Sequence, residues 1–121
     1  SYYEPWGYTP LEAIAFKVPS ITTDLAGFGL WANAEVGHSC EIIDGVEVIH
    51  RTDGNYNEVV DAIKDTVVRF SLFNDEEVKT SRTNASRLSK KALWRHFISY
   101  YLQAYNVALR KAEARKINEL N

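Results

Sequence analysis

The sequence predicts an α/β fold with about two parallel strands and four to five helices, the long ones lying toward the C-terminus. Two short β-branched segments, residues 20–23 and 46–49, enclose one helical stretch. This strand–helix–strand order is typical of parallel strands joined by a right-handed crossover. From residue 55 onward, apolar side chains recur at helical spacing. A length of 121 residues allows one domain.

The first helix is predicted to begin in residues 9–12, Thr-Pro-Leu-Glu. This segment combines the T-x-x-E pattern of a capping box, made by Thr9 and Glu12, with proline at the first helical position. Pro5 and Gly7 predict a turn just before it. Such a helix start presents unpaired backbone N–H groups and the positive end of the helix dipole, which together suit a phosphate or diphosphate.

Three shorter elements follow this helix. Pro19 ends it, and residues 20–23 form the first strand. A turn punctuated by glycines at residues 24–29 leads into a second short helix that passes through Ala34. Gly45 then opens the second strand.

Long amphipathic helices account for the rest of the chain. One starts at Asn55 and places these apolar residues on one face: Tyr56, Val60, Ile63, Val67 and Phe70. Asn74 and Glu77 are predicted to cap the next, which runs to about Lys91. The last carries a stripe of Trp94, Phe97, Ile98, Tyr101, Leu102, Tyr105, Ala108, Leu109 and Ala112. Because this stripe and the strand edges lack covering surfaces, we expect self-association.

Composition bounds the class of protein. With 45% hydrophobic residues, 25% charged residues and a net charge of −2, the chain is ordinary for a soluble protein and implies neither a membrane nor a nucleic-acid partner. The single cysteine, Cys40, excludes an internal disulfide and fits a cytoplasmic setting. His38, Cys40 and Glu41 lack the pattern of a zinc site, and His50 and His96 are isolated, so no metal is expected. Because methionine is absent, Ser1 is not expected to be the natural start.

Glu4 and Glu12 are the candidate functional carboxylates, one on each side of the predicted phosphate site. Glu12 has an alternative role as the capping residue, whereas Glu4 precedes a proline and could instead be a solvated loop residue. Gly7, Tyr8 and Thr9 form the predicted diphosphate cradle, since glycine permits close backbone approach. The alternative is a simple turn before a helix.

These residues resemble the eukaryotic-type glycogen synthases, which are retaining glycosyltransferases of GT-B architecture. Residues 1–10, Ser-Tyr-Tyr-Glu-Pro-Trp-Gly-Tyr-Thr-Pro, followed by residues 18–23 and Gly27-Phe28-Gly29, are similar to that family's donor-site segment. Further matches in order and spacing are Arg87-Leu88-Ser89, Trp94-Arg95, Tyr100-Tyr101 and Ala108-Leu109. The resemblance covers almost the whole chain, except a loop from about Glu35 to Asp44.

The resemblance implies that residues 1–121 are part of the C-terminal, nucleotide-sugar-binding Rossmann-like domain of a GT-B enzyme, truncated at its N-terminus. The implied reaction transfers glucose from UDP-glucose or ADP-glucose to glycogen or another α-1,4-glucan, with retention and without a cofactor. The acceptor would bind through the missing N-terminal domain, so we expect the chain alone to be inactive. Glu4 is implied to be catalytic, facing the donor glucose, and Glu12 to bind the donor ribose.

Two other functions remain open. One is a different retaining GT-B transferase, which the matches within residues 87–109 argue against. The other is a helical interaction module without catalysis, which the intact Glu4 and Glu12 pair argues against.

A basic helix has two interpretations. Its cations are Lys79, Arg82, Arg87, Lys90, Lys91 and Arg95. A solvated face is the simpler one, while the resemblance implies an arginine cluster that binds glucose 6-phosphate. Because the preceding turn, Asp75-Glu76-Glu77, is acidic, we expect a weak response to that activator.

Overall fold

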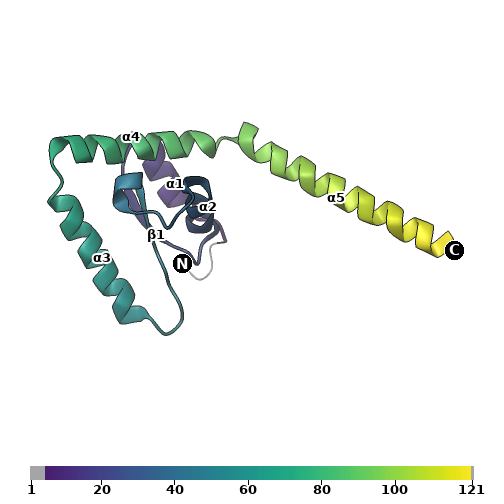
Figure 1. The fold of residues 1–121 in the computed structure, drawn as a ribbon, viewed down its shortest axis with the longest axis horizontal. Helices are drawn as coiled ribbons and strands as arrows, with labels where there is room; N and C mark the ends of the chain where they lie inside the picture. The colour runs from purple at the N-terminus through teal and green to yellow at the C-terminus, as the bar shows by residue number, and fades with distance from the viewer. Residues whose placement is uncertain (1–4, 121) are drawn as a thin grey trace. The chain divides into compact units, whose positions relative to one another are not determined.

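The computed structural model describes residues 5–120, apart from the side chains of Arg95 and His96. The chain divides into two compact units, residues 1–90 and residues 91–121. The first contains α1 (Tyr8–Ala15), β1 (Ser20–Thr23), α2 (Gly27–Val36), the short 3-10 helix η1 (Ile42–Asp44), β2 (Val46–Ile49), α3 (Tyr56–Ser71) and all but the last residue of α4 (Asp75–Lys91) (Figure 1). The second contains α5 (Trp94–Leu120). The predicted α/β class is confirmed, with a mainly helical composition.

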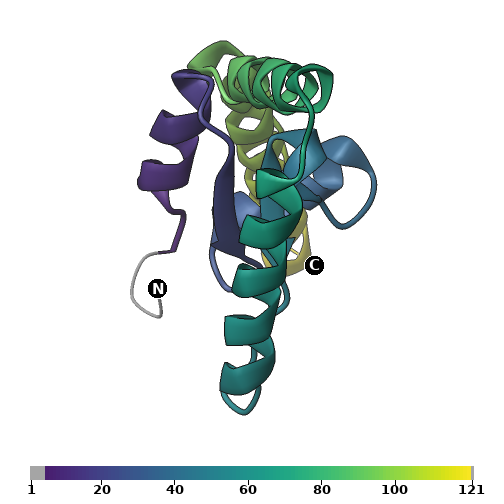
Figure 2. The ribbon, with the colours of Figure 1, turned by 90° about the vertical axis from the view of Figure 1, so that its left-hand side faces the viewer.

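The two strands form a parallel sheet, as predicted. Ser20 lies opposite Val46 and Thr23 opposite Ile49, so both strands end at the same edge. The segment between them contains α2, because parallel strands need a crossover connection. Figure 2 shows α4 at the other end of this sheet, above α1, β1 and α3.

Side-chain contacts place α4 at the amino ends of the strands. The Arg82 Nε donates to the carbonyl of Lys17, 3.2 Å away and three residues before β1. The Asn84 amide donates to the carbonyl of Ile43 at 2.9 Å, just before β2. The carboxyl ends of the strands therefore lie away from α4.

The core of the first unit lies between the sheet, α1, α2 and α4. Its buried residues are Ile14, Phe28, Ala32, Cys40, Val46, Val48, Ala85 and Leu88. Gly29 lets α2 approach β1 closely, because a Cβ atom at this position would lie 2.2 Å from the carbonyl oxygen of Thr23. Gly45, with a φ of +95°, lets α4 approach the start of β2 closely, because a Cβ atom there would lie 2.4 Å from the Ala85 nitrogen.

The predicted capping box of α1 is wrong. The helix begins at Tyr8, its N-cap is Gly7 in the left-handed region (φ 99°, ψ 76°), and no side chain caps it. Thr9 is therefore already helical. Glycine adopts this conformation readily, which lets the chain enter the helix before Thr9. Pro10 is tolerated as the third helical residue, because first-turn N–H groups have no acceptor within the helix.

The start of α2 also differs from the prediction. The glycine pattern predicts a turn over residues 24–29, but Gly27 is the first helical residue. Gly29 allows the close approach to β1, and Gly27 allows that of the Pro5 carbonyl, which explains why these glycines stand inside the helix.

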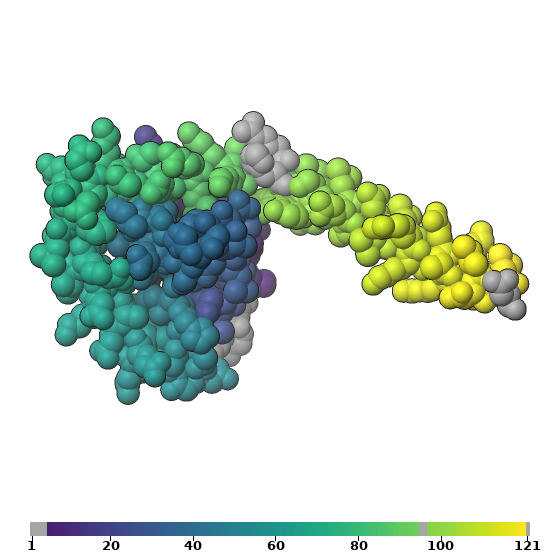
Figure 3. Space-filling view, in the orientation of Figure 1, coloured from purple at the N-terminus to yellow at the C-terminus, as the bar shows by residue number. Residues whose placement is uncertain are grey.

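Most of the apolar face predicted for α3 is exposed. Tyr56, Val60, Ile63 and Val67 have exposed fractions of 41–67%, whereas Phe70 is half-buried and the neighbouring Val59 is buried. The helix buries Val59 and Thr66, and the Arg69 guanidinium lies 2.8 Å from the Glu47 carboxylate on β2. Figure 3 shows α3 (teal) along the surface of the molecule.

The two C-terminal helices begin and extend largely as predicted. The cap of α4 is confirmed, because Asn74 Oδ1 accepts from the Glu77 N–H at 2.8 Å and Glu77 Oε1 accepts from the Asn74 N–H at 3.3 Å. The helix α5, taken by itself, leaves most of its predicted stripe exposed, including Trp94, Tyr101 and Tyr105. Of the helices that the structure describes, none has both the length and the apolar composition to cross a membrane.

Candidate functional site

Four of the five predicted site residues lie together at the start of α1. Gly7 precedes the helix, and Tyr8 and Thr9 are its first two residues. The side chains of Tyr8, Thr9 and Glu12 are all exposed. Glu4 lies outside the described residues, so its catalytic role stays a prediction.

Glu12 lies one helical turn beyond Tyr8 and on the same side of α1, since residues four apart are neighbours on a helix. Helical side chains lean toward the N-terminus, so its carboxylate is directed toward the start of the helix. The capping bond that would have occupied Glu12 is not formed. The carboxylate is therefore available to a ligand held at this helix start.

The loop before α1 is attached to the start of α2. The N–H of Gly27 donates to the carbonyl of Pro5 at 2.8 Å, and the N–H of Phe28 donates to the carbonyl of Trp6 at 2.9 Å. A Cβ atom on Gly27 would lie 2.8 Å from that Pro5 oxygen. The Trp6 ring packs against Phe28 and Trp31, with ring centroids 6.1 and 5.9 Å apart.

These contacts make the start of α2 unavailable to an anion. The leading N–H groups of α2 are already used by the Pro5 and Trp6 carbonyls. The start of α1 is the helix start that the sequence predicts for an anion, since first-turn N–H groups have no acceptor within a helix. It also lies near the carboxyl edge of the sheet, where parallel α/β folds bind ligands.

At this edge the structure joins two residues that the sequence analysis did not connect. The sequence pattern presents His50 as isolated, but its Nδ1 lies 2.6 Å from Asp24 Oδ2. The Arg51 N–H donates to Asp24 Oδ1 at 2.9 Å. Asp24 directly follows β1 and His50 directly follows β2. This shared position after neighbouring parallel strands is the feature of the sequence that could have predicted their contact.

The environment of Asp24 favours its ionised form. Partial burial by itself would raise the pKa of this carboxyl. The hydrogen bond from the Arg51 N–H and the contact with His50 outweigh burial and lower the pKa below the ordinary value of 3.8. Asp24 is therefore a charged acceptor near neutral pH.

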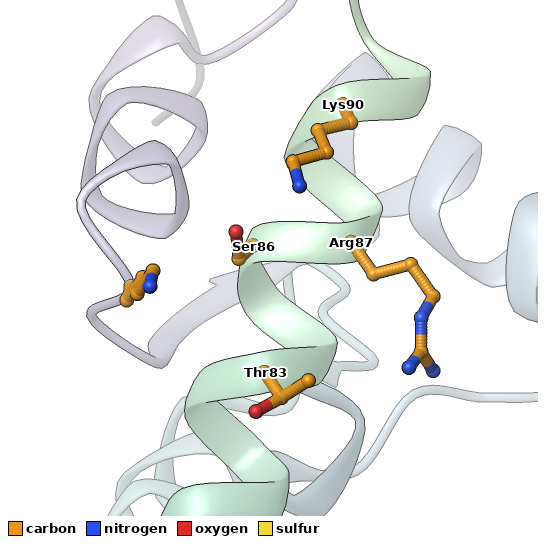
Figure 4. Close-up of a pocket in the computed structure, with 5 residues that line it drawn as sticks. Thr83, Ser86, Arg87 and Lys90 are labelled. Carbon is orange, nitrogen blue, oxygen red and sulfur yellow. The ribbon is translucent and has the colours of Figure 1, made fainter.

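A second polar region lies along α4, at the amino end of the sheet. A hollow of about 280 Å³ is lined by Lys17, Thr83, Ser86, Arg87 and Lys90. In Figure 4, Ser86 and Lys90 point to one side of α4 and Arg87 to the other. Lys17 adopts a left-handed φ of 61°.

An adjoining hollow of about 370 Å³ brings a carboxylate among these cations. It is lined by Lys17, Asp75, Val78, Lys79, Arg82 and Thr83. Asp75 belongs to the acidic turn identified in the sequence, and its charge opposes anion binding there. The expected weak response to glucose 6-phosphate stays a prediction.

Cys40 is not positioned for nucleophilic chemistry. Its side chain is buried. Loss of solvation raises the pKa of the thiol to about 11, and the nearby carboxylates of Asp44 and Glu47 act in the same direction. Nucleophilic cysteines need the opposite shift. Among the side chains that the structure describes, which exclude that of His96, no three of His, Cys, Asp or Glu form a group that could hold a metal ion.

Comparison with known proteins gives one consistent result. A family model described as glycogen synthase matches residues 1–121. The chain is 32% identical over 118 residues to a glycogen (starch) synthase of Neurospora crassa, which covers 98% of this chain and 16% of the relative. It is 32% identical over 120 residues to glycogen (starch) synthase isoform 2 of Saccharomyces cerevisiae, and the match covers 99% of this chain and 17% of that relative. It is 30% identical over 112 residues to the mouse liver protein, covering 93% and 16%. The chain thus spans only 16–17% of the length of these relatives.

Proposed function

Since the chain belongs to the glycogen synthase family, we propose that it supplies the nucleotide-sugar site of a retaining glucosyltransferase. The donor is UDP-glucose or ADP-glucose, and the acceptor is the non-reducing end of an α-1,4-glucan. The bond from the glucose C1 to the diphosphate breaks, and a bond from C1 to the acceptor oxygen forms. The acceptor hydroxyl proton leaves with the nucleoside diphosphate.

The observation that carries this proposal is the start of α1. Gly7 brings the chain into the helix without a side-chain cap, beside the carboxyl edge of the sheet. The diphosphate binds the backbone N–H groups at Tyr8 and Thr9, where the helix dipole also favours negative charge. Glu12, one turn further along and not engaged in a cap, binds the ribose hydroxyls.

Glu4 acts on the glucose itself. Its carboxylate faces the anomeric carbon and stabilises the positive charge that develops there as the bond to the diphosphate breaks. No cofactor takes part, since the helix start and basic side chains from outside residues 1–121 offset the diphosphate charge. This role rests on the family resemblance of residues 1–10.

We also propose three properties that concern the glucan-binding domain, the self-association of this chain and the cellular compartment of the enzyme. The glucan is bound by a domain outside residues 1–121, so this chain alone transfers no glucose. The chain associates with itself through exposed apolar faces. The enzyme acts in the cytoplasm, where nucleotide sugars and glucan would meet.

Saturation-transfer NMR on the 121-residue chain tests the proposed donor site. We expect UDP-glucose or ADP-glucose to receive saturation at its ribose protons, and Glu12→Ala to abolish that transfer. Glu113→Ala, which removes an exposed glutamate from α5, is the matched control and should change nothing. The absence of transfer to both nucleotide sugars would overturn the proposal for this chain.

Kinetics of the transferase that contains this chain separate the two glutamates. Glu4→Gln should lower kcat by on the order of a hundredfold or more, because it removes a charge felt mainly in the transition state. Glu12→Ala should instead raise KM for the nucleotide sugar. Thr9→Ala is the control, because it leaves the backbone N–H in place and removes no cap. If both glutamate variants changed only KM, the catalytic role of Glu4 would be wrong.

A further inference from the structure

We infer that Asp24 is a positioning residue for the proposed nucleotide-sugar site. Its carboxylate holds the start of α2 against the end of β2, and α2 in turn holds the loop that leads into α1. This inference rests on the proposed function for its consequence, but its structural part can be measured without any ligand.

The first step is the attachment of Asp24 to the end of β2. Its N–H donates to the carbonyl of Ile49 at 3.1 Å. Its two carboxylate oxygens accept from the Arg51 N–H at 2.9 Å and from the His50 Nδ1 at 2.6 Å. Asp24 thus bonds to three consecutive residues, so the turn after β1 cannot slide along β2 without breaking several bonds at once.

The second step is that the His50 side of this attachment is itself held. The Asn55 amide donates to the His50 carbonyl at 2.9 Å, and Asn55 Oδ1 accepts from the Thr52 N–H at 2.7 Å. Asn55 is the residue immediately before α3. Asp24 is therefore bonded to a segment that is bonded to the start of a 16-residue helix.

The third step connects Asp24 to the donor loop. Asp24 is separated from Gly27, the first residue of α2, by Leu25 and Ala26. The N–H groups of Gly27 and Phe28 donate to the carbonyls of Pro5 and Trp6. Gly7, the residue before α1, directly follows Trp6 in the chain. A shift of the start of α2 would therefore move the loop and the first turn of α1 with it.

Stability alone does not account for the Asp24 contacts. The side chain of His50 is 75% exposed and that of Asp24 is 23% exposed, and ion pairs with an exposed partner contribute little to folding. Neither residue belongs to the buried core cluster. What these contacts do is define where the start of α2 lies, which is a requirement of a site that must match a diphosphate closely.

The test uses Asp24→Ala and Asp24→Asn in the 121-residue chain. Two quantities are measured: NMR hydrogen exchange at the Gly27 and Phe28 amides without ligand, and the dissociation constant for UDP-glucose. We expect Asp24→Ala to speed both exchange rates and to weaken binding, each by roughly tenfold, because the Arg51 N–H and the His50 ring both lose their acceptor. Asp24→Asn keeps an acceptor for the Arg51 N–H, so its exchange rates and its dissociation constant should stay close to those of the unmodified chain.

The matched control is Arg69→Gln, which removes the ion pair between α3 and Glu47 of β2. It should change neither the exchange at Gly27 and Phe28 nor the dissociation constant. Unchanged exchange in Asp24→Ala, or equal effects in Arg69→Gln, would overturn the inference. If Asp24→Ala does not fold, His50→Ala provides the same comparison with a milder change. If the unmodified chain binds neither UDP-glucose nor ADP-glucose, the proposed function fails for this chain, while the exchange rates still decide the role of Asp24.

Discussion

At the residue scale, two glycines with positive φ have different reasons to be glycine. Gly37 has a φ of +88°, and a Cβ atom there would meet no other atom within 4 Å, so only its backbone conformation is demanding. Gly45 has a similar φ of +95°, but a Cβ atom there would lie 2.4 Å from the Ala85 nitrogen in α4. The second glycine therefore also sets the distance between α4 and the sheet.

These two positions predict different costs of substitution. Gly37→Ala should destabilise the protein by about 1–2 kcal/mol, the cost of left-handed backbone for a residue with a Cβ atom. Gly45→Ala should cost clearly more, because α4 must also move away from residues that it contacts. Urea unfolding of both variants provides the measurement. Equal losses would show that α4 adjusts freely and does not depend on the glycine.

At the element scale, the start of α4 is stabilised by its own side chains and that of α1 is not. Asn74 and Glu77 exchange two hydrogen bonds, whereas no side chain caps α1. Asn74→Ala should therefore lower the free energy of unfolding by about 0.5–2 kcal/mol, because one N–H of α4 loses its acceptor. Thr9→Ala, at the position that the sequence pattern marks as a cap, should cause no such loss. Thermal unfolding of the two variants measures both effects. A loss of stability in Thr9→Ala comparable to that in Asn74→Ala would contradict the observed start of α1.

At the scale of the whole molecule, exposed apolar faces predict self-association. The α3 face made by Tyr56, Val60, Ile63 and Val67 is exposed in the first unit, and α5 taken by itself exposes Trp94 and other aromatic residues. Patches of this kind are uncommon on monomeric proteins. Light scattering should therefore give a mass above the 13.8 kDa of one chain, rising with concentration.

A paired substitution tests which face is responsible. Val60→Lys with Val67→Lys places two charges on the exposed α3 face and should shift the mass toward one chain. A mass of 13.8 kDa for the unmodified protein at high concentration, with a cooperative melt, would count against self-association. An unchanged mass in the double variant would assign the contact to another surface.

Much of the secondary structure and the family could be predicted from residues close together in the sequence. The strands at residues 20–23 and 46–49 and the cap made by Asn74 and Glu77 were all predicted, because β-branched runs and caps depend on near neighbours. The family resemblance likewise rested on short motifs such as residues 1–10.

What only the tertiary structure decided involves contacts between distant residues. The start of α1 depends on the left-handed Gly7 and on the attachment of its loop to α2, so the local T-x-x-E pattern gave the wrong cap. The spacing predicts the apolar stripe of α3, but the packing buries Val59 and Thr66 and leaves most of that stripe exposed. Asp24 and His50 are 26 residues apart and meet only because the parallel register ends both strands at one edge. Spacing along the chain specifies an element, whereas the orientation of that element is chosen by the partner it packs against.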